Sequence, residues 1–286
     1  MSRIFVATSG RFSGLISTRT STPMNRARLF LITFLAFSMA FADGRPTQTL
    51  MSWEVDGVER KALVFVPSTA KQEPTPLVFA FHGHGGRMAG AARAFRLHEV
   101  WPEAMVVYPQ GLKTPGKLSD PEGKRPGWQS GAGKQGDRDL KFFDAMLADL
   151  SAKFKVDPKR IYSTGHSNGG AFTYMLWAER GEKLAAIAPS AAVGDRDLRK
   201  AKPLPVIHIA GTKDPLVKFA WQKMMIGAGK RLNDCSREGK EWADSATLYA
   251  SEGGAPLVTV IHPGGHEFLA SAPELIVRFF KSQKRK

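Results

Sequence analysis

The most informative segment of the chain for its fold is Arg160-Ile-Tyr-Ser-Thr-Gly-His-Ser-Asn-Gly-Gly170. Its first five residues are typical of a short buried strand, and residues 169–180 continue as a helix. Residues 165–169 fit the pattern G-x-S-x-G, in which glycines flank the serine because the backbone turns too tightly for side chains nearby. Such a turn lifts the serine hydroxyl above the sheet, beside a helix N-terminus that favours negative charge. We therefore predict Ser167 to be a nucleophile; a glycine-rich turn with an idle serine is the plainer alternative.

Strand and helix patterns alternate on both sides of this stretch. Continuous apolar runs predict further strands at residues 61–67, 76–82, 104–108, 184–188, 205–210 and 258–262. Helical spacing of apolar residues predicts helices over 140–154 and 272–281. This alternation implies an α/β fold, with a mostly parallel central sheet and helices on both faces. The glycine patterns of nucleotide-binding folds do not occur, which excludes those folds.

A nucleophilic serine needs a base, and the base needs an acid that orients it. In this architecture the three follow in the order Ser, Asp or Glu, His, each at the end of a strand. Asp214 follows the strand predicted at 205–210, and His266 follows the strand predicted at 258–262. We therefore predict Ser167, Asp214 and His266 to be the catalytic residues.

Other acids and histidines are less well placed for these roles. Asp195 and Asp197 lie in the connection that precedes strand 205–210. His208 and His262 lie inside predicted strands, where buried packing histidines are expected. The seven histidines show no metal-ligand spacing such as H-E-x-x-H, so we expect neither a metal nor another cofactor.

The reaction also needs two backbone N–H groups aimed at the negative charge that develops on the substrate oxygen. Asn168, the residue after the nucleophile, is expected to supply one. The loop His82-Gly-His-Gly-Gly86 follows an early strand, and its form predicts the N–H of His84 as the other. A flexible glycine turn is the alternative reading of this loop. The side chain of His84 is expected to be exposed.

Two connections bear on the substrate. Residues 111–136 form a long, non-periodic loop, which in a compact domain is usually functional or mobile. Trp128 in this loop could bind substrate by stacking on an aromatic acyl group or a sugar; anchoring of its own loop against the core is an equally good reading. The short segment between 188 and 205 leaves little room for a helical lid, so we expect an open cleft and no large lid.

Composition limits the classes of protein. The chain has 286 residues, 43% hydrophobic and 23% charged, an ordinary globular mixture with a net charge of +15. Five arginines and no acid fall within residues 1–42, and the other basic residues are spread thinly, so we expect no nucleic-acid partner. The lone cysteine, Cys235, excludes an internal disulfide. The sequence leaves the oligomeric state open.

The N-terminal region is interpreted as a targeting segment. Arg26 and Arg28 precede an apolar run that ends in Ala40-Phe-Ala42, the layout of a cleaved signal peptide over residues 24–42. A short membrane anchor or a buried helix is the alternative, although the run is short for a bilayer. Residues 1–23 are read as a mis-called start or unstructured extension, with an organelle transit peptide as the rival. Residues 43–286 are then one catalytic domain, secreted and without stable membrane insertion.

The sequence resembles the α/β-hydrolases and, within them, the secreted esterases that include polyhydroxybutyrate depolymerases and bacterial feruloyl esterases. The resemblance rests on residues 82–86, 108–111, 127–128, 156–162, 165–170 and 211–214. It implies a serine esterase that hydrolyses carboxylic esters through an acyl-enzyme. The sequence departs from such relatives in two ways: their common cysteines are absent, and no threonine-rich linker or separate polymer-binding module follows the catalytic domain. The second departure argues against crystalline polyester as a substrate. A peptidase of the same fold, and a non-catalytic protein that binds polysaccharide or polyester on this scaffold, stay open as alternatives.

Overall fold

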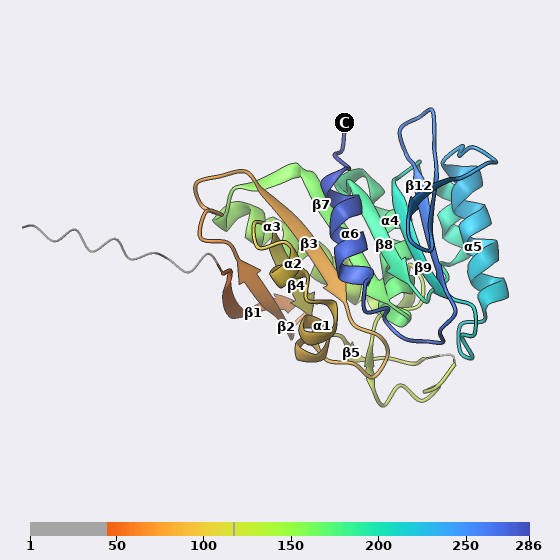
Figure 1. Cartoon of the computed structure of the whole chain (residues 1–286). Coiled ribbons are helices and arrows are strands. Elements are labelled where there is room, and N and C mark those ends of the chain that lie inside the picture. The colour runs from red at the N-terminus through yellow and green to blue at the C-terminus, as the bar shows by residue number, and fades with distance from the viewer. Residues whose placement is uncertain (1–44, 117) are drawn as a thin grey trace, which may run out of the picture. The chain divides into compact units, whose positions relative to one another are not determined.

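The structure is a computed structural model that describes residues 45–116 and 118–286 (Figure 1). The expected signal peptide and the segment before it lie outside the described residues. The strands are β1 (Thr47–Val55), β2 (Val58–Val66), β3 (Thr75–Phe81), β4 (Met105–Pro109), β5 (Leu112–Lys113), β6 (Pro126–Gly127), β7 (Val156–His166), β8 (Ala186–Ser190), β9 (Val206–Gly211), β10 (Lys240–Ala243), β11 (Ala246–Tyr249) and β12 (Leu257–His262). The helices are α1 (Met88–Phe95), α2 (Leu97–Val100), α3 (Arg138–Lys153), α4 (Asn168–Arg180), α5 (Phe219–Leu232) and α6 (Ala272–Lys281), with 3-10 turns η1 (Lys134–Asp137), η2 (Gly181–Lys183) and η3 (Arg196–Lys200).

Ten strands form one sheet in the order β1-β2-β4-β3-β7-β8-β9-β12-β11-β10. The central strands from β4 to β12 pair in parallel. The pairs at both edges, β1 with β2 and β10 with β11, are antiparallel. The parallel strands therefore bring their carboxyl ends to one edge of the sheet, and the loops that follow β3, β7, β9 and β12 meet there.

Helices cover both faces of this sheet (Figure 1). On one face, Phe79 and Phe81 of β3 pack in a core cluster with buried residues of α3, α4 and α5. On the other face, Val78 and Ala80 of the same strand pack with buried residues of α1, α2 and α6. The alternation follows from the period of two in a strand, and it explains why β3 is buried at every position and apolar from Pro76 onward.

The predicted fold class is confirmed. Each predicted strand and helix is present, with ends that move by a few residues; β7 is longer than expected because it begins at Val156. The edge strands β1, β10 and β11 and the helices α1, α2 and α5 were not predicted from the sequence. The connection from β8 to β9 holds only the turn η3, so no large lid is present among the described residues. None of the described helices is long and apolar enough to cross a membrane.

Candidate active site

The turn between β7 and α4 is strained in the way the sequence motif predicts. Ser167 has φ 56° and ψ −120°, a conformation that costs a non-glycine residue free energy. A Cβ on Gly165 would lie 2.4 Å from the carbonyl oxygen of Gly169, and a Cβ on Gly169 would lie 2.1 Å from that of Phe81. Both positions therefore require glycine. The N–H of Ser167 donates to the carbonyl of Ser190 at 2.8 Å, which ties the turn to β8.

The structure brings together the three residues predicted to be catalytic. The Oγ of Ser167 lies 2.8 Å from Nε2 of His266, and Nδ1 of His266 lies 2.8 Å from Oδ2 of Asp214. The three side chains come from the loops after β7, β12 and β9, respectively. This chain of hydrogen bonds can move a proton from the serine hydroxyl to the imidazole, while the carboxylate holds the imidazole in one tautomer.

Four hydrogen-bond donors hold the carboxylate of Asp214. Its Oδ1 accepts from the backbone N–H groups of Leu216 at 2.9 Å and Val217 at 2.8 Å. Its Oδ2 accepts from Nε2 of Gln222 at 3.2 Å as well as from His266. The side chain of Asp214 has no exposed surface, so these donors take the place of water around its charge.

Behind Asp214 lies a chain of buried, hydrogen-bonded polar side chains that the sequence patterns did not predict. The Oε1 of Gln222 contacts Nε2 of His208 at 3.2 Å, and Nδ1 of His208 contacts the hydroxyl of Tyr174 at 2.6 Å. Burial lowers the pKa of His208 to about 4, so the imidazole is neutral at neutral pH. The tyrosine O–H then donates to Nδ1, and the Nε2–H donates to Gln222. His208 was expected to be a buried packing residue; its burial is confirmed, and its contacts orient Gln222 toward Asp214.

His166 lies beside the base without joining the hydrogen-bonded chain. Its ring centroid is 5.0 Å from that of His266, and its Nδ1 lies 3.3 Å from the hydroxyl of Ser190. Burial, with a smaller effect from His266, lowers the pKa of His166 to about 4. His166 is therefore neutral at neutral pH and adds no second positive charge next to the base.

The two N–H groups expected to bind an oxyanion are placed at the serine. Ser167, Asn168 and His84 all line one cavity, and a Cβ on Gly83 would lie 3.6 Å from the Cβ of Ser167. Within residues 45–116 and 118–286, neither the N–H of His84 nor that of Asn168 has a hydrogen-bond acceptor. Both N–H groups are therefore available to donate a hydrogen bond to a ligand.

The side chain of His84 is not exposed, contrary to expectation. It is 9% exposed, and its Nε2 contacts Oδ2 of Asp120 at 2.9 Å. Asp120 also accepts from the backbone N–H groups of Lys124 and Arg125 at 3.2 and 2.8 Å. The hydrogen bond from His84 is the main reason that the pKa of Asp120 falls to about 2. The pair joins the loop after β3 to the long loop 111–136.

Trp128 does not bind substrate by stacking, because its side chain is fully buried. Its indole N–H donates to the carbonyl of His82 at 2.8 Å, and its ring packs against Phe81 and Phe172. The side chain of Asn168 pairs with the backbone of Trp128, accepting from its N–H at 2.7 Å and donating to its carbonyl at 3.2 Å. The packing alternative is therefore the correct one, and Trp128 anchors the long loop to the serine turn.

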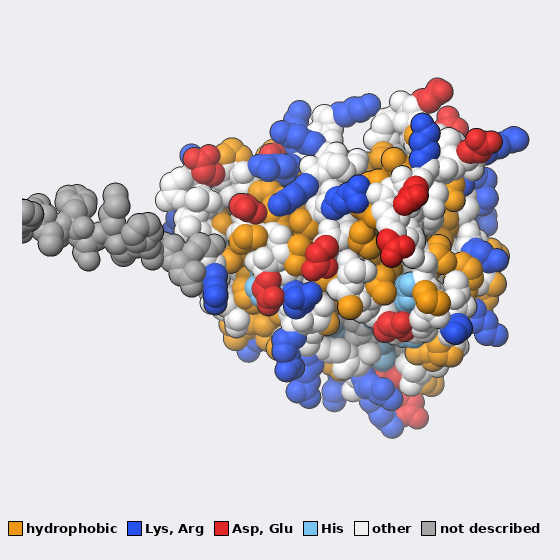
Figure 2. Space-filling view, viewed as in Figure 1, with side chains coloured by type: hydrophobic (Ala, Val, Ile, Leu, Met, Phe, Trp, Pro, Cys, Tyr) orange, Lys and Arg blue, Asp and Glu red, His pale blue; other side chains and the backbone are white. Residues whose placement is uncertain are grey.

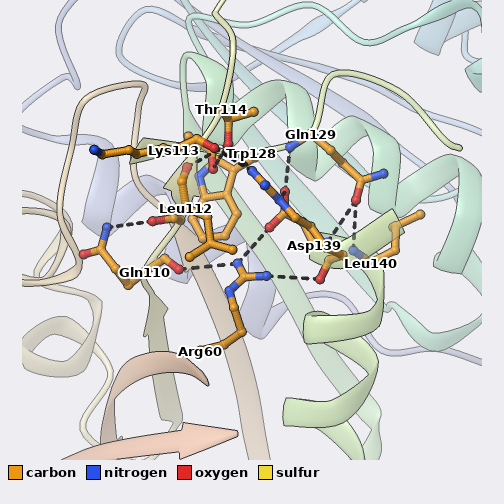
Figure 3. Close-up of polar contacts among 12 residues, drawn as sticks. Arg60, Gln110, Leu112, Lys113, Thr114, Trp128, Gln129, Asp139 and Leu140 are labelled. Atoms are coloured by element: carbon orange, nitrogen blue, oxygen red, sulfur yellow. Dashed lines mark hydrogen bonds and ion pairs between the residues drawn. The ribbon is translucent and has the colours of Figure 1, made fainter. Parts of the chain in front are cut away.

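A buried ion pair fixes the base of the same loop (Figure 3). Nη2 of Arg60 lies 2.7 Å from Oδ1 of Asp139, and the two side chains are 1% and 0% exposed. The other oxygen of Asp139 accepts from the backbone N–H of Gln129 at 2.7 Å, and Arg60 also donates to the carbonyl of Gln110. Both ends of loop 111–136 are thus held by one charge pair.

The cavity at Ser167 has a volume of about 310 Å³ and is mostly apolar. Its mouth carries Leu118, Leu216 and Trp221, which are 58%, 45% and 37% exposed. Met175 and Val193 line it deeper in the molecule. Apolar side chains of this size are usually buried, and several of them around one cavity are typical of a site for an apolar ligand.

A metal centre finds no support in the described parts of the chain. Across residues 45–116 and 118–286, no three His, Cys, Asp or Glu side chains are grouped so that they could hold an ion. Cys235 is half-buried and a free thiol.

Comparisons with known proteins agree with this geometry. Residues 126–226 match the prolyl oligopeptidase family. Among curated proteins, the chain is 31% identical over 86 residues to a bifunctional acetylxylan esterase/xylanase from Neocallimastix patriciarum, covering 30% of this chain and 13% of that protein. It is 25% identical to feruloyl esterase D from Neurospora crassa, covering 85% of this chain and 89% of that protein. Among the first curated relatives, the matches span only 13% to 43% of their length.

A solved structure titled ferulic acid esterase superposes on this chain with a TM-score of 0.59 and 14% identity, covering 84% of this chain and 98% of that one. Likeness at this identity establishes the fold. The serine turn and the parallel sheet together show that the chain has the α/β-hydrolase fold, and its similarity to esterases agrees with that fold.

Proposed function

We propose that this chain is a secreted serine esterase that hydrolyses carboxylic esters through an acyl-enzyme. One observation carries the proposal: Ser167, His266 and Asp214 form a continuous chain of hydrogen bonds, with both contacts at 2.8 Å, at the wall of an apolar cavity. Two backbone N–H groups without acceptors among the described residues lie at the same cavity.

The steps follow from these positions. Nε2 of His266 takes the proton of Ser167 as Oγ attacks the ester carbonyl, and the N–H groups of His84 and Asn168 bind the resulting oxyanion. His266 returns the proton to the leaving alcohol, which departs and leaves an acyl-serine. Water, losing a proton to His266, attacks the acyl carbon. The acid leaves, and the proton returns to Oγ.

The finer proposal is an ester of an aromatic acid, of the feruloyl type, and it rests on the cavity. A planar ring with a short conjugated arm fits about 310 Å³ that is lined by Met175, Leu216 and Trp221. Similarity to feruloyl esterase D supports the same class. A hydroxybutyrate oligomer, as in the polyhydroxybutyrate depolymerases, is the second ester class to be tested.

The test compares kcat/KM on methyl ferulate and on a hydroxybutyrate oligomer, with S167A as the blank. A fluorophosphonate probe provides an independent readout, because it adds its phosphonyl group to an activated serine. Mass spectrometry is expected to find that adduct on Ser167 in the unmodified protein and to find no adduct in S167A. No ester hydrolysis above the blank together with no adduct would overturn the proposal.

A peptidase is the second candidate, because the matched family over residues 126–226 is that of the prolyl oligopeptidases. The same catalytic residues can cleave an amide. Acyl-aminoacyl p-nitroanilides, assayed beside the esters, discriminate between the two: a peptidase would show kcat/KM on the anilide at least equal to that on methyl ferulate.

Secretion rests on the sequence of residues 24–42 alone. Expression of the full chain with its own N-terminus, followed by sequencing of the mature protein, tests it. The expected new N-terminus is Asp43, after Ala40-Phe-Ala42. Retention of the full chain inside the cell would contradict secretion without bearing on the esterase activity.

A further inference from the structure

A second hollow adjoins the cavity at Ser167. It has a volume of about 810 Å³ and lies between η3 and α5. Val193, Gly194, Asp195 and Trp221 line both hollows, so the two form one groove that leads away from the serine. Gly194 is held in this wall by its N–H, which lies 3.2 Å from Sδ of Met225. We call this outer part, lined by Leu198, Arg199, Trp221, Met224 and Arg231 among others, the outer groove.

The outer groove combines an aromatic surface with positive charge. Trp221 is 37% exposed and Met224 is 66% exposed. Arg199 and Arg231 both line the groove, and within residues 45–116 and 118–286 neither guanidinium has a hydrogen bond or an ion pair. Asp195, in the wall shared with the inner cavity, is the one acid of the lining. Figure 2 shows Lys and Arg side chains along the edge of the molecule that α5 forms.

Two arginines against one aspartate attract an anion, and an arginine fork matches a carboxylate better than any other common group. An exposed indole face packs well on a flat, partly apolar surface such as that of a sugar ring. Trp221 and Arg231 lie ten residues apart on α5, which is roughly 15 Å along the helix axis. The ligand that meets both features is therefore an oligosaccharide with carboxylates, which places one unit against Trp221 and the carboxylate of another beside the arginines. Such an oligosaccharide also extends naturally from an ester bond held at Ser167, because the groove is continuous with the inner cavity.

We propose that the outer groove binds a uronic acid unit of the ester substrate, so that the enzyme prefers esters of acidic oligosaccharides to those of neutral ones. This inference rests on the proposed esterase function and names the part of the substrate beyond the ester bond. Trp221 supplies the stacking surface for one unit, and Arg199 and Arg231 bind the carboxylate of another.

The kinetic experiment uses two matched substrates, a feruloyl ester of a galacturonate trimer and the same ester of a neutral galactose trimer. The double variant R199Q/R231Q is compared with R93Q/R237Q, which removes two exposed arginines that line neither hollow. We expect R199Q/R231Q to raise KM for the acidic substrate by roughly 5- to 20-fold, with kcat and the neutral substrate within about twofold. The control is expected to leave both substrates unchanged, and 0.5 M salt to reduce the preference of the unmodified enzyme.

A binding experiment separates this inference from the esterase proposal. Calorimetry on S167A, which cannot turn over substrate, measures affinity for the unesterified galacturonate trimer and for the galactose trimer. Tighter binding of the acidic trimer that R199Q/R231Q abolishes would support the outer groove even if no ester were cleaved. Any of three results would overturn the inference. The first is equal affinity for both trimers, the second is an equal loss of affinity for the acidic trimer in R93Q/R237Q, and the third is equally tight binding of a short single-stranded DNA. Hydrolysis of both esters with no preference would agree with the proposed esterase activity and would refute the proposed binding of uronic acid in the outer groove.

Discussion

The contact between His84 and Asp120 leads to a prediction about the oxyanion site. Asp120 accepts hydrogen bonds from the His84 side chain at 2.9 Å and from the backbone of Arg125 at 2.8 Å, and so holds the residue whose N–H we propose to bind the substrate oxygen. D120A removes these contacts and leaves the catalytic residues intact. The expected result is a lower kcat with little change in KM, because an oxyanion donor acts on charge that develops only in the transition state.

The size of the effect is bounded on both sides by the structure. Loss of one oxyanion donor outright costs roughly 100- to 1000-fold in kcat. D120A does not free the whole loop, because the N–H of Gly85 still donates to Pro126 at 2.7 Å and that of Gly86 to Gly83 at 2.9 Å. We therefore expect kcat to fall by roughly 10- to 100-fold. D120N, whose amide oxygen can still accept from His84, is expected to recover most of the loss.

The assay is steady-state hydrolysis of a chromogenic ester over a range of concentrations, with circular dichroism to verify folding. E122A is the matched control, since Glu122 lies in the same loop, is exposed and pairs only with Lys124 among the described residues. Because the pKa of Asp120 is about 2, the carboxylate is charged throughout the assay range, and the ratio of D120A to unmodified enzyme is expected to be constant from pH 5 to 9. A kcat for D120A within twofold of the unmodified value, or an equal loss in E122A, would refute this reasoning.

Three further predictions concern the serine turn and the buried histidine behind the acid. S167A is expected to lower kcat by roughly 10⁴- to 10⁶-fold in the same ester assay while leaving the melting temperature nearly unchanged; a tenth of the activity remaining would exclude Ser167 as the nucleophile. G169A places a Cβ 2.1 Å from the carbonyl oxygen of Phe81 and is expected to lower the free energy of unfolding, measured in urea, by about 3 kcal/mol or more. The control G90A, whose Cβ would have open space around it in α1, is expected to be neutral or slightly stabilising. The pKa of His208 is about 4 in the folded chain and roughly 6.5 in the unfolded chain, so the unfolded state binds more protons between these pH values. The contribution of His208 to stability is therefore fully present above pH 6.5 and is lost as the pH falls to about 4. We expect His208 to lower the free energy of unfolding by about 2 kcal/mol between pH 7 and pH 5, and we expect a smaller loss in H208Q. An identical pH dependence of stability in both proteins would contradict this role of His208.

Much of the fold and the catalytic geometry could be predicted from the sequence because both rest on local patterns. The glycines at 165 and 169 are required by contacts within or beside their own turn. Asp214 and His266 follow strands that are apolar at nearly every position, and parallel strands bring their carboxyl ends to one edge. The order of strands and helices along the chain therefore predicted which three side chains could meet.

The edge strands and the roles of several polar residues could not be predicted in this way. β1 is mostly exposed, and β10 and β11 are short, so neither periodicity nor apolar runs identify them. The packing of Trp128 and the burial of His84 depend on partners far along the chain. Trp128 meets Asn168 after 40 residues, and His84 meets Asp120 after 36.

The order of strands and helices, the serine turn and the identity of the three residues expected to carry the chemistry all follow from the sequence. These depend on local backbone requirements and on the position of each residue at the end of a strand. The contacts of the folded chain were needed to show that Trp128 is an anchor, that His84 is tied to Asp120, and that Gln222 and His208 lie behind Asp214. Such contacts depend on how loops of different length fold back on one another, because a hydrogen bond needs atoms within about 3 Å, and the spacing of residues in a sequence does not fix that distance.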